Sequence, residues 1–372
     1  MAFKGVLESP EITPAPFGLF SVSVPNDPAE SDNEQWVRGF SQMLDTRPNY
    51  VRLWDDTSAT SFVATSDPAS PIYQENTPIF IEVEDFRSTF DLPTADKFSR
   101  IAKQLEGVTQ KGLEKELWDG EIALAGGLPN PFLSKQTATI IHVTATPSAS
   151  YSPKRAIALL DYHAGRVSAA GEPGVFHLTR DTFSLLISNG HTFAFYPNSE
   201  APHHVLTLSG TSVIVGSGYS GNGPHRNISF LAVTTNVVTV TTGAAHHLSV
   251  GETFSMVVTS GNAGYQTAFT QTLVVASIPT TTTFTAALTQ ANQGDTASTG
   301  TVQMVGTDTT KWIYATGCVK TIVGDSVIVN DTVAHGYDVA GNKNDVRIKA
   351  TRAAMASFDE SIHLAIKVDL TA

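Results

Sequence analysis

The chain has 372 residues, a net charge of −12 and a content of 41% hydrophobic and 16% charged residues, which excludes a disordered or collagen-like protein. Its single cysteine, Cys318, excludes an internal disulfide and a cysteine-based zinc cluster and favours folding in a reducing cytosol. The sequence shows no signal-peptide core and no run of about 18 apolar residues. We therefore expect a soluble protein, and its acidic balance argues against tight nucleic-acid binding, which depends on basic groups.

The first quarter of the chain is acidic and rich in proline. Residues 1–96 hold sixteen Asp and Glu against five Lys and Arg, and ten of the nineteen prolines. Because proline fixes φ and removes a backbone donor, this pattern predicts an extended arm with little core of its own. We expect such a segment to be disordered, to pack over the rest of the chain, or to lie on a neighbouring subunit.

A helix and a hairpin are expected within this quarter. Ser31 and Glu34 form a capping-box pattern, and apolar residues follow at helical spacing until Arg47-Pro48, which predicts a helix. Residues 50–54 and 79–83 are typical of two strands that flank a polar stretch, so a long hairpin is predicted there. A hairpin alone is marginal in water.

The middle of the chain has α+β character. The longest predicted helix spans about residues 94–125, where apolar side chains share one face; Gly107 and Gly112 indicate a bend or a close crossing, and Gly126-Gly127 end it. Two further helices are predicted from proline and threonine residues that mark their starts and glycine residues that mark their ends. Those helices run from Ser152-Pro153 to Gly165 and from Thr179 to Asn189-Gly190, and strands are expected at 139–144, 192–196, 205–208 and 211–215.

Residues 230–306 differ abruptly in composition. They contain nineteen Thr, two acidic residues and no Lys or Arg. Short β-branched runs separated by Gly, Asn or Pro predict an inserted all-β domain of five or six strands. After this insert we expect strands at 312–319 and 327–329 with a turn at Val323-Gly324-Asp325-Ser326 between them, and two closing strands at 346–355 and 362–370.

No pattern predicts a catalytic, cofactor or metal site. Gly216-Ser217-Gly218-Tyr219-Ser220-Gly221 matches a dinucleotide fingerprint, but Asn222-Gly223-Pro224 follows it, so no helix opens at the glycines to bind a pyrophosphate. The paired histidines His203-His204 and His246-His247 point successive side chains apart and do not suit one metal.

Two further candidates also have simpler explanations. The carboxylates Glu114, Glu116, Asp119 and Glu121 are interspersed with Lys111 and Lys115, which is typical of a solvated helix face with i,i+4 pairs. Cys318 lies in a β-run and is expected to be a small buried residue.

Two blocks of sequence resemble major capsid proteins of tailed bacteriophages, especially those that infect actinobacteria. The first block comprises Ile79-Phe80-Ile81-Glu82-Val83-Glu84-Asp85-Phe86-Arg87-Ser88-Thr89-Phe90, residues 97–105, and Leu113 to Ala123 with Trp118-Asp119-Gly120 at its centre. The second comprises Trp312-Ile313-Tyr314-Ala315-Thr316-Gly317, Asn344-Asp345-Val346, Arg352-Ala353-Ala354 and Phe358-Asp359 through Val368-Asp369-Leu370.

The resemblance implies the α+β Hong Kong 97-like capsid fold, whose parts come in the same order as the predicted elements. It implies an N-terminal arm at 1–54, an E-loop at 55–93, a peripheral (P) domain with a long spine helix at 94–150, and an axial (A) domain at 151–229. The inserted β domain, similar to small Ig-like or sandwich modules of phage virions, takes 230–306, and the A and P domains continue at 307–343 and 344–372.

The resemblance also implies a function. The chain would be a non-enzymatic shell protein that self-assembles into hexamers and pentamers of an icosahedral head around phage DNA, in the cytoplasm of a bacterial host. Portal, separate scaffold and possibly cement proteins would be its partners, with no cofactor and no membrane. Some relatives crosslink an E-loop lysine, but no Lys occurs between Lys4 and Lys97. Large apolar residues tend to dominate interfaces, so the expected assembly anchors are Trp36, Phe40, Trp54, Ile79 and Phe80.

Two alternatives remain open at this point. An encapsulin-like compartment keeps the fold and encloses cargo enzymes in place of a genome. A β-rich virion adhesin that binds carbohydrate is suggested by the Thr-rich insert, although Phe254, Tyr265, Phe269 and Phe284 are its only aromatic residues after Phe230 and a core would use most of them.

Overall fold

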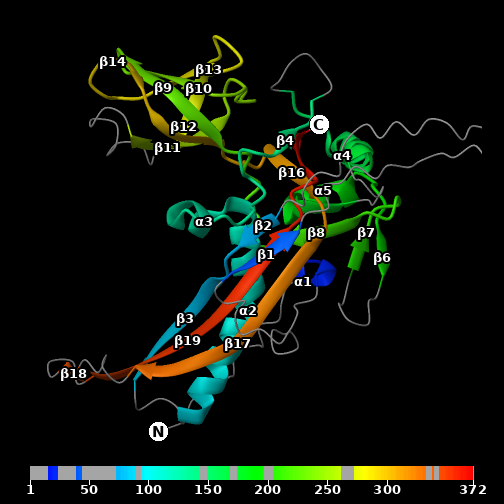
Figure 1. Cartoon of the computed structure of the whole chain (residues 1–372), viewed down its shortest axis with the longest axis vertical. Coiled ribbons are helices and arrows are strands. Elements are labelled where there is room, and N and C mark those ends of the chain that lie inside the picture. Colours follow the sequence, from blue (N-terminus) through cyan, green and yellow to red (C-terminus); the bar gives the residue numbers. More distant parts are fainter. Residues whose placement is uncertain are drawn as a thin grey trace, which may run out of the picture.

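Four sheets and five helices form the described part of the chain. Figure 1 shows an elongated lower part built on the longest helix, a lobe of sheet and helices at the upper right, and a separate all-β lobe at the upper left. The computed structural model describes residues 16–23, 39–43, 73–88, 94–142, 149–167, 174–196, 204–260, 272–331, 337–338 and 343–371.

The elongated part is an antiparallel sheet, here called the long sheet, with a helix along one face (Figure 1). Its strands are β3 (Ile79–Ser88), β19 (Lys343–Phe358) and β17 (Val319–Asp331), in that spatial order, with the short β18 (Tyr337–Asp338) paired to the start of β19. The helix is α2 (Thr94–Asp119), whose Ile101 and Leu105 pack against Ile348 and Ala350 of β19. Alternate side chains of the strands point to the opposite face, and among the described residues no helix packs against that face.

The long helix ends earlier than its apolar pattern predicts. α2 stops at Asp119, Gly120 is in the left-handed region with φ +62°, and a short helix α3 (Glu121–Gly126) follows up to Gly127 at φ +62°. The single helix predicted over 94–125 is therefore wrong. The close crossing predicted at Gly112 is confirmed, because a Cβ there would lie 3.4 Å from the Cδ1 atom of Ile81 on β3.

Gly120→Ala is expected to destabilise the protein more than Gly127→Ala. Both glycines have φ +62°, which costs an L-residue about 1 kcal/mol. A Cβ at Gly120 would lie 2.3 Å from the Phe132 ring, whereas nothing lies within 4 Å at Gly127. We expect a free-energy loss of about 1 kcal/mol for Gly127→Ala and about 2–4 kcal/mol for Gly120→Ala, because the second also forces a clash. Urea unfolding followed by tryptophan fluorescence measures both, and equal losses would contradict the clash.

The upper right lobe contains a mixed seven-stranded sheet, here called the central sheet. Its spatial order is β4-β20-β16-β5-β8-β7-β6. Helices α4 (Pro153–Val167) and α5 (Arg180–Ser188) cover it, with Ile157, Leu160 and Leu186 in the same core as Phe176 and Ile313. The strands are β4 (Thr139–Ile140), β20 (His363–Asp369), β16 (Thr310–Thr316), β5 (Val175–Thr179), β8 (Ser212–Gly216), β7 (His204–Leu206) and β6 (Ala194–Tyr196).

The Thr-rich insert forms a closed ring of strands, here called the ring module. The pairing runs β9-β10-β13-β12-β11-β15 and returns to β9, with β14 also paired to β9. The prediction of a separate all-β unit agrees with these strands, but the sheet closes on itself where a sandwich of two open sheets was expected. The strands are β9 (Arg226–Thr234), β10 (Val237–Thr242), β11 (Thr253–Ser260), β12 (Thr272–Ser277), β13 (Thr283–Ala287), β14 (Gln293–Ala297) and β15 (Thr299–Met304).

The N-terminal quarter differs most from its predictions. Residues Phe40–Met43 form a strand, β1, paired with β2 (Tyr73–Asn76), so the helix predicted through them is wrong there. The strand predicted at 79–83 is confirmed as the start of β3, but it pairs with β19, and its predicted hairpin partner at 50–54 lies outside the described residues.

One segment expected in the arm packs on its own chain. Residues 16–23 include a short helix α1 (Leu19–Val22), and Leu19 is completely buried. The Val215 amide donates to the Phe17 carbonyl at 2.7 Å, and the Ser23 and Thr321 hydroxyls lie 3.2 Å apart. This part of the arm therefore belongs to the core of its own subunit.

The turn predicted at Val323-Gly324-Asp325-Ser326 is also wrong. β17 runs through these residues, and its pairing with β19 shifts register between Val323 and Ser326. The Gly-Asp signal thus marks a bulge in a continuous strand, a common role for glycine in β-structure.

Candidate assembly surfaces

The five predicted anchor residues have different positions. Trp36 and Trp54 lie outside the described residues, and Phe40 lies in β1, where its side chain is not described. Ile79 and Phe80 are neighbours on β3 and therefore point to opposite faces. Ile79 is 5% exposed and Phe80 is 62% exposed. Within the described chain, only Phe80 of this set is positioned to contact another molecule.

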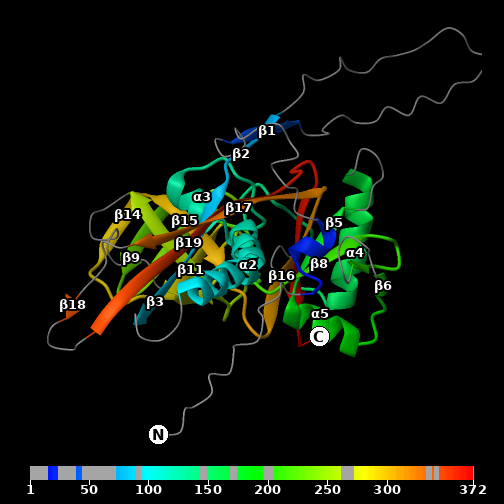
Figure 2. The same ribbon diagram turned by 90° about the horizontal axis from the view of Figure 1, so that it is seen from below.

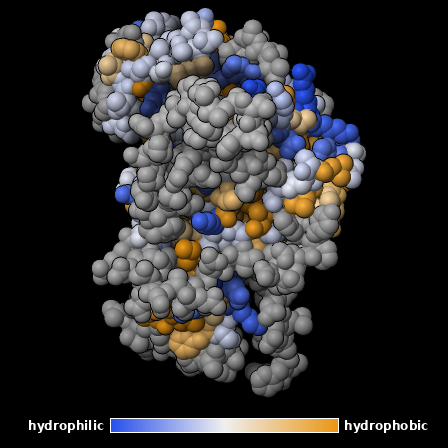
Figure 3. Space-filling model, turned by 45° about the vertical axis from the view of Figure 1, so that its right-hand side comes forward, coloured by the Kyte–Doolittle hydropathy of each residue, from blue (hydrophilic) through white to orange (hydrophobic). Residues whose placement is uncertain are grey.

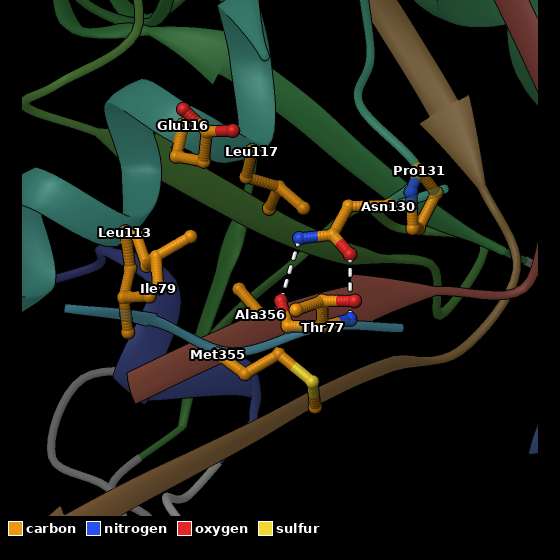
Figure 4. A pocket seen from close by; sticks show the side chains of 9 residues that line it. All are labelled: Thr77, Ile79, Leu113, Glu116, Leu117, Asn130, Pro131, Met355 and Ala356. Carbon is orange, nitrogen blue, oxygen red and sulfur yellow. Dashed lines mark hydrogen bonds between the residues drawn. The ribbon is translucent and has the colours of Figure 1, made fainter. Parts of the chain in front are cut away.

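The start of β3 is fixed to its own chain around Ile79. Figure 4 shows two hydrogen bonds between the Asn130 side chain and the Thr77 backbone. The Thr77 amide donates to Asn130 Oδ1 at 2.6 Å, and Asn130 Nδ2 donates to the Thr77 carbonyl at 2.7 Å. Ile79, Leu113 and Leu117 line the same small cavity, whose volume of about 10 Å³ is enough for about one water molecule. This cavity is a packing gap and no ligand site.

The helix-free face of the long sheet carries exposed apolar side chains. Phe80 on β3 and Val327 and Val329 on β17 are exposed, and the register places all three on this face. Lys349 of β19 forms an ion pair with Glu82 of β3 between them. We call this face the sheet surface. Apolar side chains that share one face are typical of a protein contact.

A second group of exposed apolar side chains lies on the lobe of the central sheet. Tyr162 of α4, Ile187 of α5, Phe195 of β6 and Leu208 after β7 are all exposed. The Thr211 hydroxyl donates to Asp161 at 2.8 Å, which ties the turn after β7 to α4. In Figure 3 hydrophobic side chains lie among hydrophilic ones on this side of the molecule. We call this group the lobe surface.

The lobes are joined by a buried carboxylate. Glu114 of α2 is completely buried and accepts five hydrogen bonds. Its Oε2 atom accepts from the Ser217 amide at 2.7 Å, the Gly218 amide at 2.9 Å and the Ser217 hydroxyl at 3.1 Å. Its Oε1 atom accepts from the Leu19 amide at 3.0 Å and the Gln110 side chain at 2.8 Å. The glycine-rich loop therefore does hold an anion, but the anion is the protein's own carboxylate.

The neighbouring acidic residues are also structural. Asp119 accepts from Ser220 at 2.8 Å and Asn222 at 3.1 Å, and burial raises its pKa. Glu116 accepts from the Ile122 amide at 2.9 Å and the Ala123 amide at 2.8 Å, both in the first turn of α3. Only Glu121, paired with Lys115 at 2.8 Å, fits the predicted solvated face. That prediction is wrong for Glu114 and Asp119, which fix the loop after β8 to α2.

The ring module is attached to the central sheet through buried polar contacts. Lys367 of β20 is almost completely buried, forms an ion pair with Glu252 and donates to the His247 carbonyl at 3.1 Å. Arg226 at the start of β9 donates to the carbonyls of Ala245, Gln136 and His225 at 3.0–3.1 Å. These contacts hold the module against the sheet and do not leave it on a flexible tether.

The other candidate side chains do not form a chemical site. His246 accepts from the Leu248 amide at 3.0 Å, and no group of three metal-ligating side chains occurs in the part of the chain that the structure describes. Cys318 was expected to be buried but is exposed, because it follows Gly317 at the bend where β16 ends and β17 begins. Among the described helices, none is both long and apolar enough to span a bilayer.

Comparison with known proteins gives structural likeness only. No protein-family model and no curated protein matches the sequence. The structure is similar to the capsid of a native GTA particle, with a TM-score of 0.42 and 10% sequence identity over 99% of this chain and 93% of that chain. It is similar to a chain of Mycobacterium phage Ogopogo, with a TM-score of 0.42 and 12% identity over 98% of this chain and 94% of that chain. It is also similar to the holo-SrpI encapsulin complex from Synechococcus elongatus, with a TM-score of 0.40 and 11% identity over 100% of this chain and 94% of that chain.

Other similar structures are the capsid of an empty GTA particle and chains of Mycobacterium phage Che8 and Microbacterium phage Oxtober96. The GTA, Ogopogo and encapsulin likenesses have 10–12% sequence identity and extend over nearly the whole chain.

Proposed function

We propose that this chain is the major capsid protein of a tailed double-stranded DNA bacteriophage. Many copies would assemble as hexamers and pentamers into an icosahedral head, without enzymatic activity. The observation that carries this proposal is the presence of two separate apolar surfaces on one firmly joined subunit, the sheet surface and the lobe surface.

Two different surfaces suit a closed shell. A heterologous contact joins one surface of a subunit to a different surface of the next, and such contacts close into rings when the rotation permits. A shell subunit must contact its neighbours within a ring and between rings, so it needs more than one surface. Each contact is modest, and the shell is held by their number.

The proposed domain division follows the order of elements. Residues 1–54 would be the arm and 55–93 the E-loop, with α2 as the spine helix of a P domain over 94–150 and 344–372. Strands β5, β6, β7, β8 and β16 with α4 and α5 would form the A domain over 151–229 and 307–343, and the ring module at 230–306 would project from it. The P-domain segments add β4 and β20 to the same sheet, and β17 of the A-domain range pairs with β19 of the P domain. The pairing of β3 with β19 at ten positions supports joining the end of the E-loop to the P domain.

The charge of the chain suits an enclosing shell. With a net charge of −12, the protein would not neutralise phosphates and would bind DNA weakly. Packaged DNA would therefore slide along the inner wall during filling. A portal, a separate scaffold and cement proteins would complete the head.

Electron microscopy of the expressed full-length chain tests the proposal. We expect icosahedral shells or ring-shaped capsomers, and a monodisperse monomer under all assembly conditions would overturn it. Phage-derived particles should also contain nuclease-protected double-stranded DNA. Shells filled with enzymes in place of DNA would instead identify an encapsulin-like compartment.

A further inference from the structure

One short turn of the ring module, residues 246–252, binds a buried lysine of the central sheet and is here called the latch turn. Among the described residues, every polar partner of the Lys367 ammonium lies in this turn. They are the His247 carbonyl at 3.1 Å, the Ser249 hydroxyl at 3.1 Å and the Glu252 carboxylate. The Lys367 side chain is 3% exposed, so the ammonium is satisfied only while the turn keeps its shape.

His246 fixes the shape of the latch turn at its start. Its Nε2 atom lies 3.2 Å from the Thr280 carbonyl oxygen, which can only accept, so Nε2 carries the proton. Its Nδ1 atom accepts from the Leu248 amide at 3.0 Å and therefore carries none. The ring is thus neutral in the closed turn, and each nitrogen has the partner that its tautomer requires.

A second proton on His246 is incompatible with the closed turn. It would convert Nδ1 from an acceptor into a donor that faces the Leu248 amide, which is also a donor. Leu248 is 1% exposed, so little water can replace the lost acceptor. The next residue, His247, has φ +57°, an unfavourable value outside glycine. The turn therefore depends on hydrogen bonds of this kind for its conformation.

The charges around the latch turn also oppose a positive imidazole. Lys367 approaches from the central sheet, and Arg226 of β9 donates to the Ala245 carbonyl at 3.1 Å. Glu252 is the one carboxylate in these contacts among the described residues, and it already pairs with Lys367. The other titratable groups on the adjoining segments are imidazoles, which gain positive charge in acid: His247, His142 with its ring 5.8 Å from that of His247, and His225 beside Arg226.

We propose that the latch turn is a proton-operated switch that fixes the ring module to the central sheet at neutral pH and releases it in mild acid. Protonation of His246 opens the turn, and the Lys367 ammonium loses its partners there. The Arg226 contacts, close to the two chain connections of the module, then remain as a pivot. All of these contacts lie within one subunit, so the inference is independent of the proposed function.

The pH range follows from the two states of His246. In the closed turn, burial and then the Lys367 ammonium lower the pKa of His246, and the hydrogen bond to the Thr280 carbonyl opposes them. In the open turn the ring is hydrated and its pKa returns to about 6.5. The closed turn is therefore fully stable above about pH 6.5 and loses stability as the pH falls below that value.

Hydrogen exchange of the full-length chain tests the opening. After correction for the intrinsic pH dependence of exchange, we expect the protection of amides 246–252 to fall about fivefold from pH 7 to 5.5. His246→Asn keeps an oxygen near the place of Nδ1 but cannot take up a proton, so its protection should be equal at both pH values. His163→Asn on α4 is the matched control and should retain the fall.

Three results would overturn the switch. They are constant protection of the latch turn in the unaltered chain, a fivefold fall that persists in His246→Asn, and protection equal to that of β5 and β16 at each pH. The last result would mean that the turn opens only when the whole subunit unfolds.

Fluorescence anisotropy tests the release of the module itself. Cys318→Ser removes the exposed native thiol, after which a dye is attached to Val237→Cys, an exposed position on the ring module. Its anisotropy should fall from pH 7 to 5.5, and adding His246→Asn should abolish the fall. A dye on Tyr162→Cys, exposed on α4, is the control and should keep its anisotropy. A constant value on the module, or an equal fall at both positions, would contradict the release.

Discussion

Lowering the pH from 7 to 4.5 is expected to destabilise the folded subunit by about 5–8 kcal/mol, because three buried histidines must remain neutral. Burial lowers the pKa of His177 to about 3 and the pKa of both His225 and His363 to about 4. The His177 ring nitrogens lie 2.9 Å from the hydroxyls of Tyr219 and Thr316. Neither ring nitrogen of His225 has a hydrogen-bond partner among the residues that the structure describes.

The direction of this effect follows from the proton count. An unfolded histidine with a pKa near 6.5 takes up a proton as the pH falls, whereas these folded histidines do not, so the unfolded state gains stability. Each histidine costs about 2.5 kcal/mol by pH 4.5, and the loss develops between about pH 6.5 and 4. Asp119, whose pKa is raised by burial, opposes the loss in part because the folded state binds its proton more readily.

Urea unfolding at several pH values measures this dependence. His225→Phe should reduce it by about one third and leave stability at pH 7 nearly unchanged, since it removes two unpartnered nitrogens beside the Phe132 ring. His163→Gln changes a half-buried histidine on α4 and is the control variant, which should keep the pH dependence of the unaltered subunit. Equal stability of the unaltered subunit at pH 7 and 4.5 would contradict the assignment of these histidines.

Glu114→Ala is expected to cost about 3–5 kcal/mol of folding free energy. The substitution leaves the buried donors of Leu19 and Gln110 and the part-buried amides of Ser217 and Gly218 without their acceptor. Glu114→Gln keeps the shape of the side chain but turns an amide donor toward other donors, so an intermediate loss is expected. Glu106→Ala, at an exposed position of the same helix, should change stability by no more than about 0.5 kcal/mol.

Glu114→Ala should also loosen residues 17–23. Leu19 donates its amide to Glu114, so the alanine variant removes one of the bonds that hold residues 17–23. Limited proteolysis should then cut within this segment at least tenfold faster than in the Glu106→Ala control. Equal cutting rates with unchanged stability would show that Glu114 does not join the segment to α2.

Local signals predicted the helices of the central sheet well. Pro153 begins α4, Thr179 precedes α5, and Asn189 follows its last residue, which is how such residues act at helix ends. The helix predicted over Phe40–Met43 was wrong because a mixture of apolar and polar residues this short fits the helical and the strand period equally well. Pairing with β2 makes it a strand. The break at Gly120 depends on Phe132, twelve residues away, and is not visible in the helical pattern.

The buried carboxylates were missed because sequence spacing does not show what surrounds a helix. Around α2, Glu114 falls between Leu117 and Trp118, both buried, so it lies on the enclosed face of the helix although Lys111 and Lys115 nearby are exposed. One signal was present: the glycine-rich loop at 216–221 has free amides and no following helix to use them. Such a loop requires an acceptor, and a carboxylate among apolar neighbours is a suitable one.

The ring module enters and leaves the subunit at one place. The Gly223 amide donates to the Met304 carbonyl at 2.9 Å, and Arg226 pairs with Val302 in the β9–β15 ladder. Excision at these two points leaves chain ends close enough to splice with a few residues. A foreign domain joined at this place would need only short connections, but it would also have to supply a partner for the buried Lys367 ammonium, which Glu252 and the His247 carbonyl bind here.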